Sequence, residues 1–266
     1  MSTDTQSEHY GEGYDYLGES PHLKHRHLYS GLTTRVADAV EATARPAPEV
    51  LEIGAGDGSV TEFLLARGYR VTATEMSRES VEAMQRRFGT GERFRALHDP
   101  GDLSSLGDSR FDAILFASVL HHIPDYESAV RHAVDSHLRA GGSFVSIQDP
   151  PWYPRMNPLT KSFSDVCYLS WRLTQGELLR GLKTRTRRRF SGLSEEAPSD
   201  VVEYHVVRNG VDEEALTALL AERFGRVETV RYWSSQGSPQ QRLGERLSLT
   251  NTFALFATEA REGPAA

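Results

Sequence analysis

Cysteine is almost absent from this sequence, since Cys167 is the only one among 266 residues. A single cysteine cannot form an intrachain disulfide and leaves no Cys-x-x-Cys pair for a metal or a redox centre. No run of 18 or more apolar residues occurs, and the N-terminal Met-Ser-Thr-Asp has neither the charged nor the apolar part of a signal peptide. We therefore expect a cytoplasmic protein that has no membrane partner.

Positively charged residues are also fewer than negatively charged ones. Thirty Lys and Arg residues face 37 Asp and Glu residues, and the formal net charge is −7. General nucleic-acid binding depends on neutralising phosphates, so this balance argues against a nucleic-acid partner. His22, His25 and His27 are close in sequence but have no carboxylate ligands beside them, and no H-x-E-H spacing occurs. The sequence predicts no metal site.

The most informative feature that is present is a glycine-rich turn. Residues 50–53 are an apolar run typical of a buried parallel strand, and residues 60–65 have the apolar spacing of a helix. Between them lie Gly54, Gly56 and Gly58. A strand, a glycine turn and a helix place bare backbone N–H groups at a helix N-terminus, where a polar small molecule can approach closely. The pattern predicts a cofactor site.

Two cofactor classes compete for this turn, beside the alternative of a tight turn without a ligand. A dinucleotide fingerprint G-x-G-x-x-G would need its third glycine at Ser59, and no Tyr-x-x-x-Lys pair accompanies it. The spacing here is G-x-G-x-G, with Glu52 two residues upstream. A nicotinamide-dependent oxidoreductase is therefore the less favoured alternative.

Acidic residues end the next two expected strands. Residues 71–75 end at Glu75, about twenty residues beyond the glycines, where a carboxylate can accept hydrogen bonds from both hydroxyl groups of a ribose. Residues 94–99 form the third expected strand, which ends at Asp99. Both acids would lie at the carboxyl edge of a parallel sheet.

The fourth and fifth expected strands carry the most distinctive motifs. Residues 110–117 run into Leu-His-His-Ile-Pro-Asp at 120–125, and residues 138–147 contain a Leu-x-x-Gly-Gly turn into a strand. With the glycine turn and the two acids, these segments resemble class I S-adenosylmethionine (SAM) dependent methyltransferases that act on small molecules. The resemblance covers roughly residues 47–149 and, less specifically, residues 211–260.

This resemblance implies SAM as the cofactor. Glu75 would bind the ribose and Asp99 the adenine amino group. The residues expected to bind the cofactor are Glu52, Gly54, Ala55, Gly56, Glu75, Met76, Asp99, Pro100 and Ser118.

Histidines are the expected catalytic groups. A hydroxyl or ammonium acceptor must lose a proton during methylation, and histidine titrates near neutral pH. His121 and His122 follow the fourth strand at the edge where open α/β sheets bind ligands. In some amine methyltransferases a histidine at the position of His121 pairs with an N-terminal tyrosine, a part open here to Tyr14 or Tyr10. A capping or packing role remains the alternative for each histidine.

The acceptor pocket is expected after the fifth strand. Asp149-Pro150-Pro151-Trp152 resembles the catalytic signature of adenine-N6 methyltransferases, but there the tetrapeptide ends the fourth strand and here it follows the fifth. We therefore interpret residues 149–153 as a rigid turn that lines the pocket with Trp152 and Tyr153. His205, in a β-prone run, is a further candidate for contact with the acceptor.

The expected fold is α/β: a doubly wound, mostly parallel, seven-stranded Rossmann-like sheet with an antiparallel last strand. A helical N-terminal lid would occupy residues 1–45, with one helix from Ser20 to about Thr43. The core would span residues 46–150, a helical cap residues 151–210, and the rest of the sheet residues 211–260. An apolar stripe along residues 158–182 is expected to pack on the protein's own core.

Together these features predict methyl transfer to an oxygen or nitrogen of a small organic molecule by a monomer or homodimer. The arginine, alanine and glycine bias suggests a high-GC bacterial genome and hence specialised, antibiotic-type biosynthesis. The main alternative is a SAM-binding enzyme that catalyses a reaction without methyl transfer, such as a cyclisation.

Overall fold

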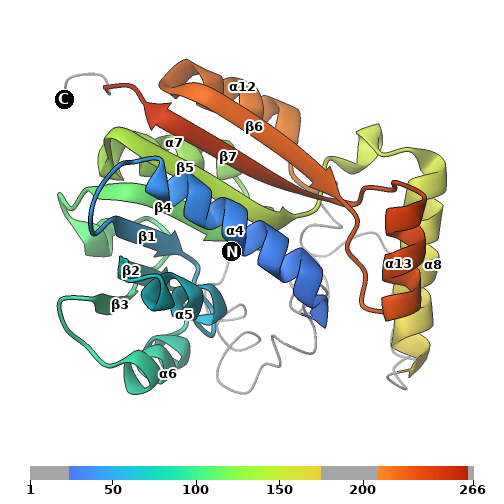
Figure 1. The fold of residues 1–266 in the computed structure, drawn as a ribbon, viewed down its shortest axis with the longest axis horizontal. Helices are drawn as coiled ribbons and strands as arrows, with labels where there is room; N and C mark the ends of the chain where they lie inside the picture. The colour runs from blue at the N-terminus through green and yellow to red at the C-terminus, as the bar shows by residue number, and fades with distance from the viewer. Residues whose placement is uncertain (1–23, 175–208, 263–266) are drawn as a thin grey trace.

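The computed structural model describes residues 24–174 and 209–262, and all structural statements refer to these residues. Seven strands form one sheet in the order β3-β2-β1-β4-β5-β7-β6 (Figure 1). The strands β1 to β5 pair in parallel, whereas β7 is antiparallel to both of its neighbours. Their bounds are Glu49–Ile53 (β1), Arg70–Glu75 (β2), Phe94–His98 (β3), Phe111–Ala117 (β4), Leu138–Asp149 (β5), Phe224–Tyr232 (β6) and Thr252–Ala260 (β7).

Helices cover both faces of this sheet (Figure 1). The helices α4 (Arg26–Glu41), α5 (Ser59–Ala66) and α6 (Arg78–Phe88) lie on one face, and α7 (Tyr126–His137) and α12 (Glu213–Arg223) lie on the other. Beyond the sheet lie α8 (Pro158–Thr174) and α13 (Ser238–Arg246). No helix in the described part of the chain combines the length and the apolar character needed to cross a bilayer.

The central strand β4 shows why both faces are covered. Ala113 and Leu115 pack into the apolar cluster under α4, α5 and α6, whereas Ile114 and Phe116 pack into the cluster under α7 and α12. Successive side chains of a strand point to opposite faces, so a continuous apolar run needs a helical layer on each side. The expected doubly wound α/β sheet is confirmed, and its antiparallel strand β7 lies between β5 and β6.

The N-terminal helix differs from the expectation of one continuous helix. In the structure α4 starts at Arg26, because the backbone of His25 is extended, with φ −98° and ψ 91°. The expected start at Ser20 lies outside the described residues. The imidazole of His25 is buried and its Nε2 donates to the carbonyl oxygen of Ser235 at 2.6 Å. This contact ties the start of α4 to the segment after β6.

The expected apolar stripe of α8 does not pack on the core along its whole length. Leu159, Val166 and Leu169 are 80%, 62% and 38% exposed. The helix instead contacts the protein through Phe163, whose ring centroid lies 5.3 Å from that of Trp233. The spacing of apolar residues identified the helix correctly but not the face that it buries. That face is set by the segment around α13, which the sequence did not predict.

Glu52 of β1 is a buried carboxyl group under α5. Glu52, in the middle of β1, is 1% exposed and accepts a 2.5 Å hydrogen bond from Thr61 Oγ1 of α5. Burial raises the pKa of this carboxyl to about 8, with further contributions from the nearby Asp57 and Glu75 carboxylates. At neutral pH the neutral acid is therefore the favoured form.

This carboxyl predicts a pH-dependent stability. Because its folded pKa lies above the ordinary value of 4.5, its contribution is complete below pH 4.5 and is lost as pH rises through about 8. Glu52→Gln keeps the shape and cannot ionise. The melting temperature of the variant should therefore rise relative to the wild type between pH 5 and pH 8.5, measured by thermal unfolding. A difference that stays constant over this range would contradict a raised pKa.

Candidate functional site

The candidate site lies at the carboxyl edge of the parallel strands. The strand order reverses between the neighbouring strands β1 and β4. From β1 the chain continues to β2 on one side, and from β4 it continues to β5 on the other side. In open α/β sheets, ligands bind at such a switch point. In register, Ile53 of β1 lies opposite both Thr74 of β2 and Phe116 of β4. The residues that follow these strands therefore meet at one place.

The glycine turn between β1 and α5 has no room for side chains. Gly54 and Gly58 have φ angles of +69° and +78°, which disfavour any residue with a Cβ. A Cβ on Gly54 would lie 2.7 Å from Val119 Cγ2, and one on Gly58 would lie 2.7 Å from Phe88 Cε2. The turn therefore presents bare backbone, as the sequence predicts.

Several N–H groups of this turn make hydrogen bonds within the protein. The N–H groups of Gly54 and Ala55 both donate to the carbonyl oxygen of Thr74, at 2.9 and 3.1 Å. That of Gly56 donates to Glu75 Oε2 at 2.9 Å. These bonds tie the turn to the end of β2. A ligand on this backbone would lie against its van der Waals surface and the adjacent carboxylate.

Glu75 is well placed to bind a ligand hydroxyl. Its Oε1 accepts from the backbone N–H groups of Met76 and Ser77, at 2.7 and 3.1 Å, and its Oε2 accepts only from Gly56 among the described residues. A carboxylate oxygen can accept two hydrogen bonds, so Oε2 has a lone pair left. The side chain is also partly exposed. This geometry fits the expected ribose contact.

Asp99 is used differently from the expectation. Its Oδ1 accepts from the N–H groups of Gly101 and Leu103, and its Oδ2 accepts from the N–H and the hydroxyl of Ser105, all within 3.1 Å. These four bonds fill the four lone-pair positions of a carboxylate. The side chain is 2% exposed. In this structure Asp99 holds the loop after β3 and has no acceptor position left for an adenine amino group.

The other expected cofactor residues are divided between edge and interior. Ser118 follows β4 with a left-handed φ of +61°, and its N–H donates to the carbonyl oxygen of Ile147 at 2.8 Å. Met76 lies beside Glu75, and Pro100 is exposed after β3. Glu52 reaches into α5 rather than toward the edge. The structure therefore brings Gly54, Gly56, Glu75, Met76 and Ser118 together at the edge.

A histidine and an aspartate form the catalytic candidate. His121 Nδ1 donates to Asp149 Oδ1 at 2.7 Å, and the backbone N–H of His121 donates to the same oxygen at 3.2 Å. The second oxygen, Oδ2, accepts from Ser146 Oγ at 2.8 Å. Asp149 is fully buried, and the His121 side chain is 10% exposed. The carboxylate thus fixes the ring from behind.

A β-bulge places this aspartate. Ile147 of β5 lies opposite Ala254 of β7, but Asp149 lies opposite Phe253, so Gln148 is an extra residue. Its φ is +72°. Without the bulge, Asp149 would follow the alternation onto the same face as Ile147. The extra residue instead turns Asp149 to the face of Ser146, where His121 lies.

His122 lies beside His121, with ring centroids 4.0 Å apart. Its catalytic part remains a prediction. The turn after β5 is held by α12 and by the segment before it. The Trp152 N–H donates to Glu213 Oε2 of α12 at 3.1 Å, and the Tyr153 N–H donates to the carbonyl oxygen of Asn209 at 2.8 Å. This agrees with a fixed turn, but contact of Trp152 and Tyr153 with an acceptor stays a prediction. Tyr10, Tyr14 and His205 lie outside the described residues.

Asp149 was missed as the partner of His121. The two residues are 28 apart in sequence, and their contact depends on the bulge at Gln148, for which the sequence carries no clear signal. The only sequence clue was an acid at the end of the fifth strand. Within residues 24–174 and 209–262, no group of three or more His, Cys, Asp or Glu side chains could hold a metal ion.

The site fits a sulfonium nucleoside in part. The side-chain-free turn at Gly54 to Gly58 and the open lone pair of Glu75 suit the sugar and the methionine portion. Asp99 does not fit the expected adenine contact, because its acceptor positions are full. The glycine turn and Glu75 would therefore hold the cofactor.

Comparison with known proteins supports this interpretation. Residues 51–144 match a family model described as a methyltransferase domain. The chain is 44% identical over 61 residues to the mycinamicin-resistance protein MyrB of Micromonospora griseorubida, 23% of this chain and 19% of that protein. It is 31% identical over 97 residues to the ubiquinone biosynthesis O-methyltransferase of Chromobacterium violaceum, 35% and 41% of the two chains. The chain thus spans about a fifth to two fifths of these relatives.

Solved structures agree on the fold. The N-methyltransferase NodS of Bradyrhizobium japonicum WM9, in complex with S-adenosyl-L-homocysteine (SAH), superimposes with a TM-score of 0.54 at 17% identity, over 96% of each chain. The magnesium protoporphyrin IX methyltransferase ChlM of Synechocystis PCC 6803, with bound SAH, gives 0.53 at 16% identity, over 97% of this chain and 93% of that one.

The sheet order, the glycine turn with Glu75 and the matched methyltransferase domain lead to one conclusion. The chain contains a methyltransferase domain at residues 51–144, and its sheet has the fold of class I methyltransferases, whose cofactor is SAM.

Proposed function

We propose that this protein transfers the methyl group of SAM to an oxygen or nitrogen atom of a small organic molecule, with His121 as the general base. The observation that carries this proposal is the 2.7 Å hydrogen bond between His121 Nδ1 and the buried Asp149, at the edge that also holds the glycine turn. A hydroxyl or ammonium acceptor needs such a base, and a carboxylate behind the ring orients it.

When bound, the cofactor supplies an electrophilic methyl group on its sulfonium. Asp149 accepts the Nδ1 proton of His121, so in the neutral ring Nε2 carries the lone pair that can accept a proton. An acceptor hydroxyl or ammonium group would pass its proton to this Nε2. Asp149 then faces an imidazolium and stabilises its charge. The chain otherwise aligns the reacting atoms, the main requirement of a direct displacement.

The environment of Asp149 matches this task. Burial raises the pKa of its carboxyl to about 6, while the hydrogen bonds from Ser146 and from the backbone of His121 favour the ionised form. A carboxylate with a pKa near 6 and a histidine in direct contact titrate as a pair. Such a pair remains competent as a base at neutral pH and loses this ability in mild acid.

The acidic chain favours a small acceptor over a nucleic acid. The net charge of −7 offers little attraction for phosphates. Three relatives are named as ribosomal RNA small subunit methyltransferase A, among them that of Synechococcus elongatus at 40% identity over 73 residues, but the matches cover only 22–27% of this chain and 22–25% of those proteins. The name of the ubiquinone biosynthesis O-methyltransferase refers to the synthesis of a small molecule, and the name of MyrB refers to resistance to mycinamicin. We extend this to specialised, antibiotic-type metabolites in a bacterium.

The alternative of a SAM-dependent reaction without methyl transfer uses the same cofactor site. The mass of the product distinguishes the two. The protein is incubated with methyl-labelled SAM and a panel of phenols, carboxylic acids and primary or secondary amines. We expect SAH to form together with a product about fourteen mass units heavier than its acceptor. Turnover to a product of unchanged mass would contradict methyl transfer and support the alternative.

Among the predictions made by substitution in this site, the first concerns the cofactor carboxylate. Glu75→Ala removes the expected acceptor of the ribose hydroxyls and should weaken SAM binding about tenfold to a hundredfold, the range for hydrogen bonds to a charged group. Isothermal titration calorimetry with SAM measures this effect. Glu82→Ala, on the exposed side of α6, is the matched control and should bind like the wild type. An unchanged affinity in the Glu75 variant would remove this residue from the site.

The second prediction concerns the base. His121→Ala should lower methyl transfer by about a hundredfold or more, the usual contribution of general acid–base catalysis, because no other group then takes the acceptor proton from this position. SAM affinity by calorimetry should change little, since the loss is chemical. His122→Ala is the companion variant that tests the neighbouring ring. Full turnover in the His121 variant would exclude it from the mechanism.

The third prediction concerns pH. The wild-type rate should fall as pH drops through about 6, because Asp149 and His121 then take up protons as a pair. Asp149→Asn should be at least about a hundredfold slower near neutral pH, because its amide can donate to Nδ1 and would leave the proton on Nε2. Its pH–rate profile should lack the wild-type fall near pH 6. An unchanged profile in this variant would contradict the pairing.

A further inference from the structure

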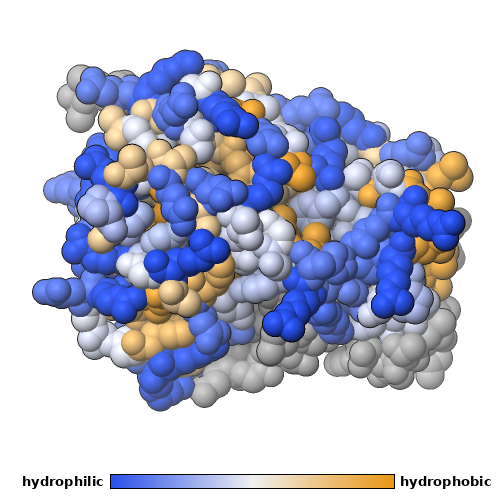
Figure 2. Space-filling model, in the orientation of Figure 1, coloured by the Kyte–Doolittle hydropathy of each residue, from blue (hydrophilic) through white to orange (hydrophobic). Residues whose placement is uncertain are grey.

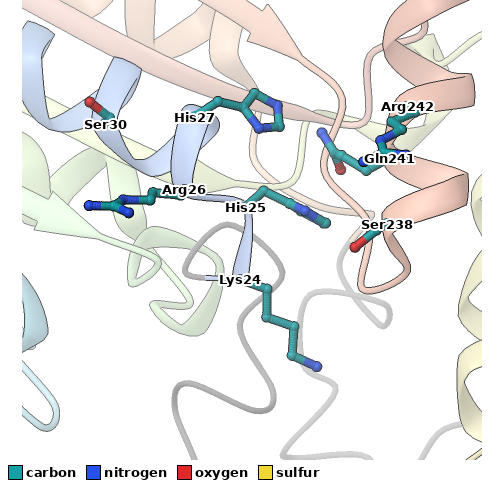
Figure 3. Close-up of a pocket in the computed structure, with 8 residues that line it drawn as sticks. All are labelled: Lys24, His25, Arg26, His27, Ser30, Ser238, Gln241 and Arg242. Carbon is teal, nitrogen blue, oxygen red and sulfur yellow. The ribbon is translucent and has the colours of Figure 1, made fainter.

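A hollow outside the methyl-transfer site lies between the first turns of α4 and α13. Its volume is about 570 Å³, within the size range of small-molecule sites. Figure 3 shows the side chains around it, and Figure 2 shows that the surface over α13 is strongly hydrophilic. The residues that line it are Lys24, His25, Arg26, His27, Ser30, Ser238, Gln241 and Arg242.

The lining is basic, although the chain as a whole carries a net charge of −7. Lys24, Arg26 and Arg242 make no ion pair with any described residue, whereas arginines elsewhere commonly do, as Arg35 does with Glu228 at 2.7 Å. Lys24 Nζ instead lies 6.0 Å from the ring centroid of Trp171. Three unneutralised cations around one hollow repel one another, and a bound anion would relieve this repulsion.

The acid beside the hollow is already engaged. Glu245 Oε1 accepts from His27 Nε2 at 2.7 Å and from Gln241 Nε2 at 2.8 Å. These bonds hold His27 and Gln241 in place. Because Glu245 is engaged in them, it is less available to form an ion pair with Lys24, Arg26 or Arg242. The wall is also fixed from the other side by the hydrogen bond of His25 to Ser235. The lining is therefore anchored by side-chain hydrogen bonds.

The backbone adds to the positive potential. Both α4 and α13 begin at this hollow, and neither N-cap residue, His25 or Gly237, provides a side-chain cap. The first N–H groups of a helix carry partial positive charge and attract anions. The effect of the two helix ends supports that of the cations.

The cations are spread along the hollow. In Figure 3, Lys24 points toward the bottom of the view, Arg26 points to the side opposite α13, and Arg242 lies on α13 itself. A single small anion therefore cannot contact all three. A longer ligand with several negative groups can contact more than one of them.

We propose that this hollow binds an elongated small molecule that carries two or more phosphate or carboxylate groups, at a site separate from that of SAM. The unneutralised Lys24 and Arg242 and the hydroxyl groups of Ser30 and Ser238 supply donors for such groups. The proposal is independent of the methyl-transfer reaction proposed above.

Calorimetric titration with inorganic triphosphate and with orthophosphate, at constant ionic strength, tests this site. We expect one site that binds triphosphate at least about tenfold more tightly than orthophosphate. Arg242→Gln and Lys24→Gln should each weaken triphosphate binding about tenfold, the effect of losing one charge-assisted hydrogen bond. Arg246→Gln is the matched control, because it removes the same charge one turn further along α13 but outside the lining.

Several results would overturn the proposal. Equal losses in the Arg242 and Arg246 variants would show a general effect of net charge rather than a site. Equal affinity for the two phosphates would contradict an elongated ligand. Triphosphate binding that disappears when the protein is saturated with SAM would assign the cations to the cofactor. The Arg242 variant should bind SAM with the same affinity as the wild type. A failure of this proposal can therefore be distinguished from a failure of the proposed methyl transfer.

Discussion

The parallel register of β1 with β2 and β4 is the constraint on which the site depends. Ile53, Thr74 and Phe116 lie in line across these strands, so the turn at Gly54, the carboxylate of Glu75 and Ser118 emerge together at one edge. The apolar layers on both faces fix this register, because a shift by one residue would exchange the two faces of every strand. The cofactor site is thus a consequence of how the core packs.

The acids near the site have separate tasks because their surroundings differ. Glu75 is partly exposed and keeps a lone pair for a ligand, whereas Asp99 uses all its lone pairs within its own loop. Glu52 is buried under Thr61 and favours the neutral form. Asp149 is buried against His121. The same functional group therefore occurs in four different environments, from the partly exposed Glu75 to the fully buried Asp149.

The bulge in β5 connects the fold with the proposed chemistry. Because Gln148 is an extra residue, Asp149 changes face and meets His121, which follows the neighbouring strand β4. After β5 the chain enters a turn in which the Trp152 N–H donates a hydrogen bond to Glu213 of α12. On the other side of the sheet, His25 and Ser235 join α4 to the segment that leads into α13.

The sequence by itself determined the α/β class, the glycine turn and the acid at Glu75, because these depend on local patterns: strand runs, positive φ angles and the distance along one β-α-β unit. It also indicated His121 as a base. Only the tertiary structure showed that Asp149 is the partner of His121 and that the acceptor positions of Asp99 are filled by its own loop. It also determined which side of α8 is exposed and where the basic side chains beside α13 lie. Each of these depends on contacts between residues far apart in the chain, whose geometry arises only when the layers pack.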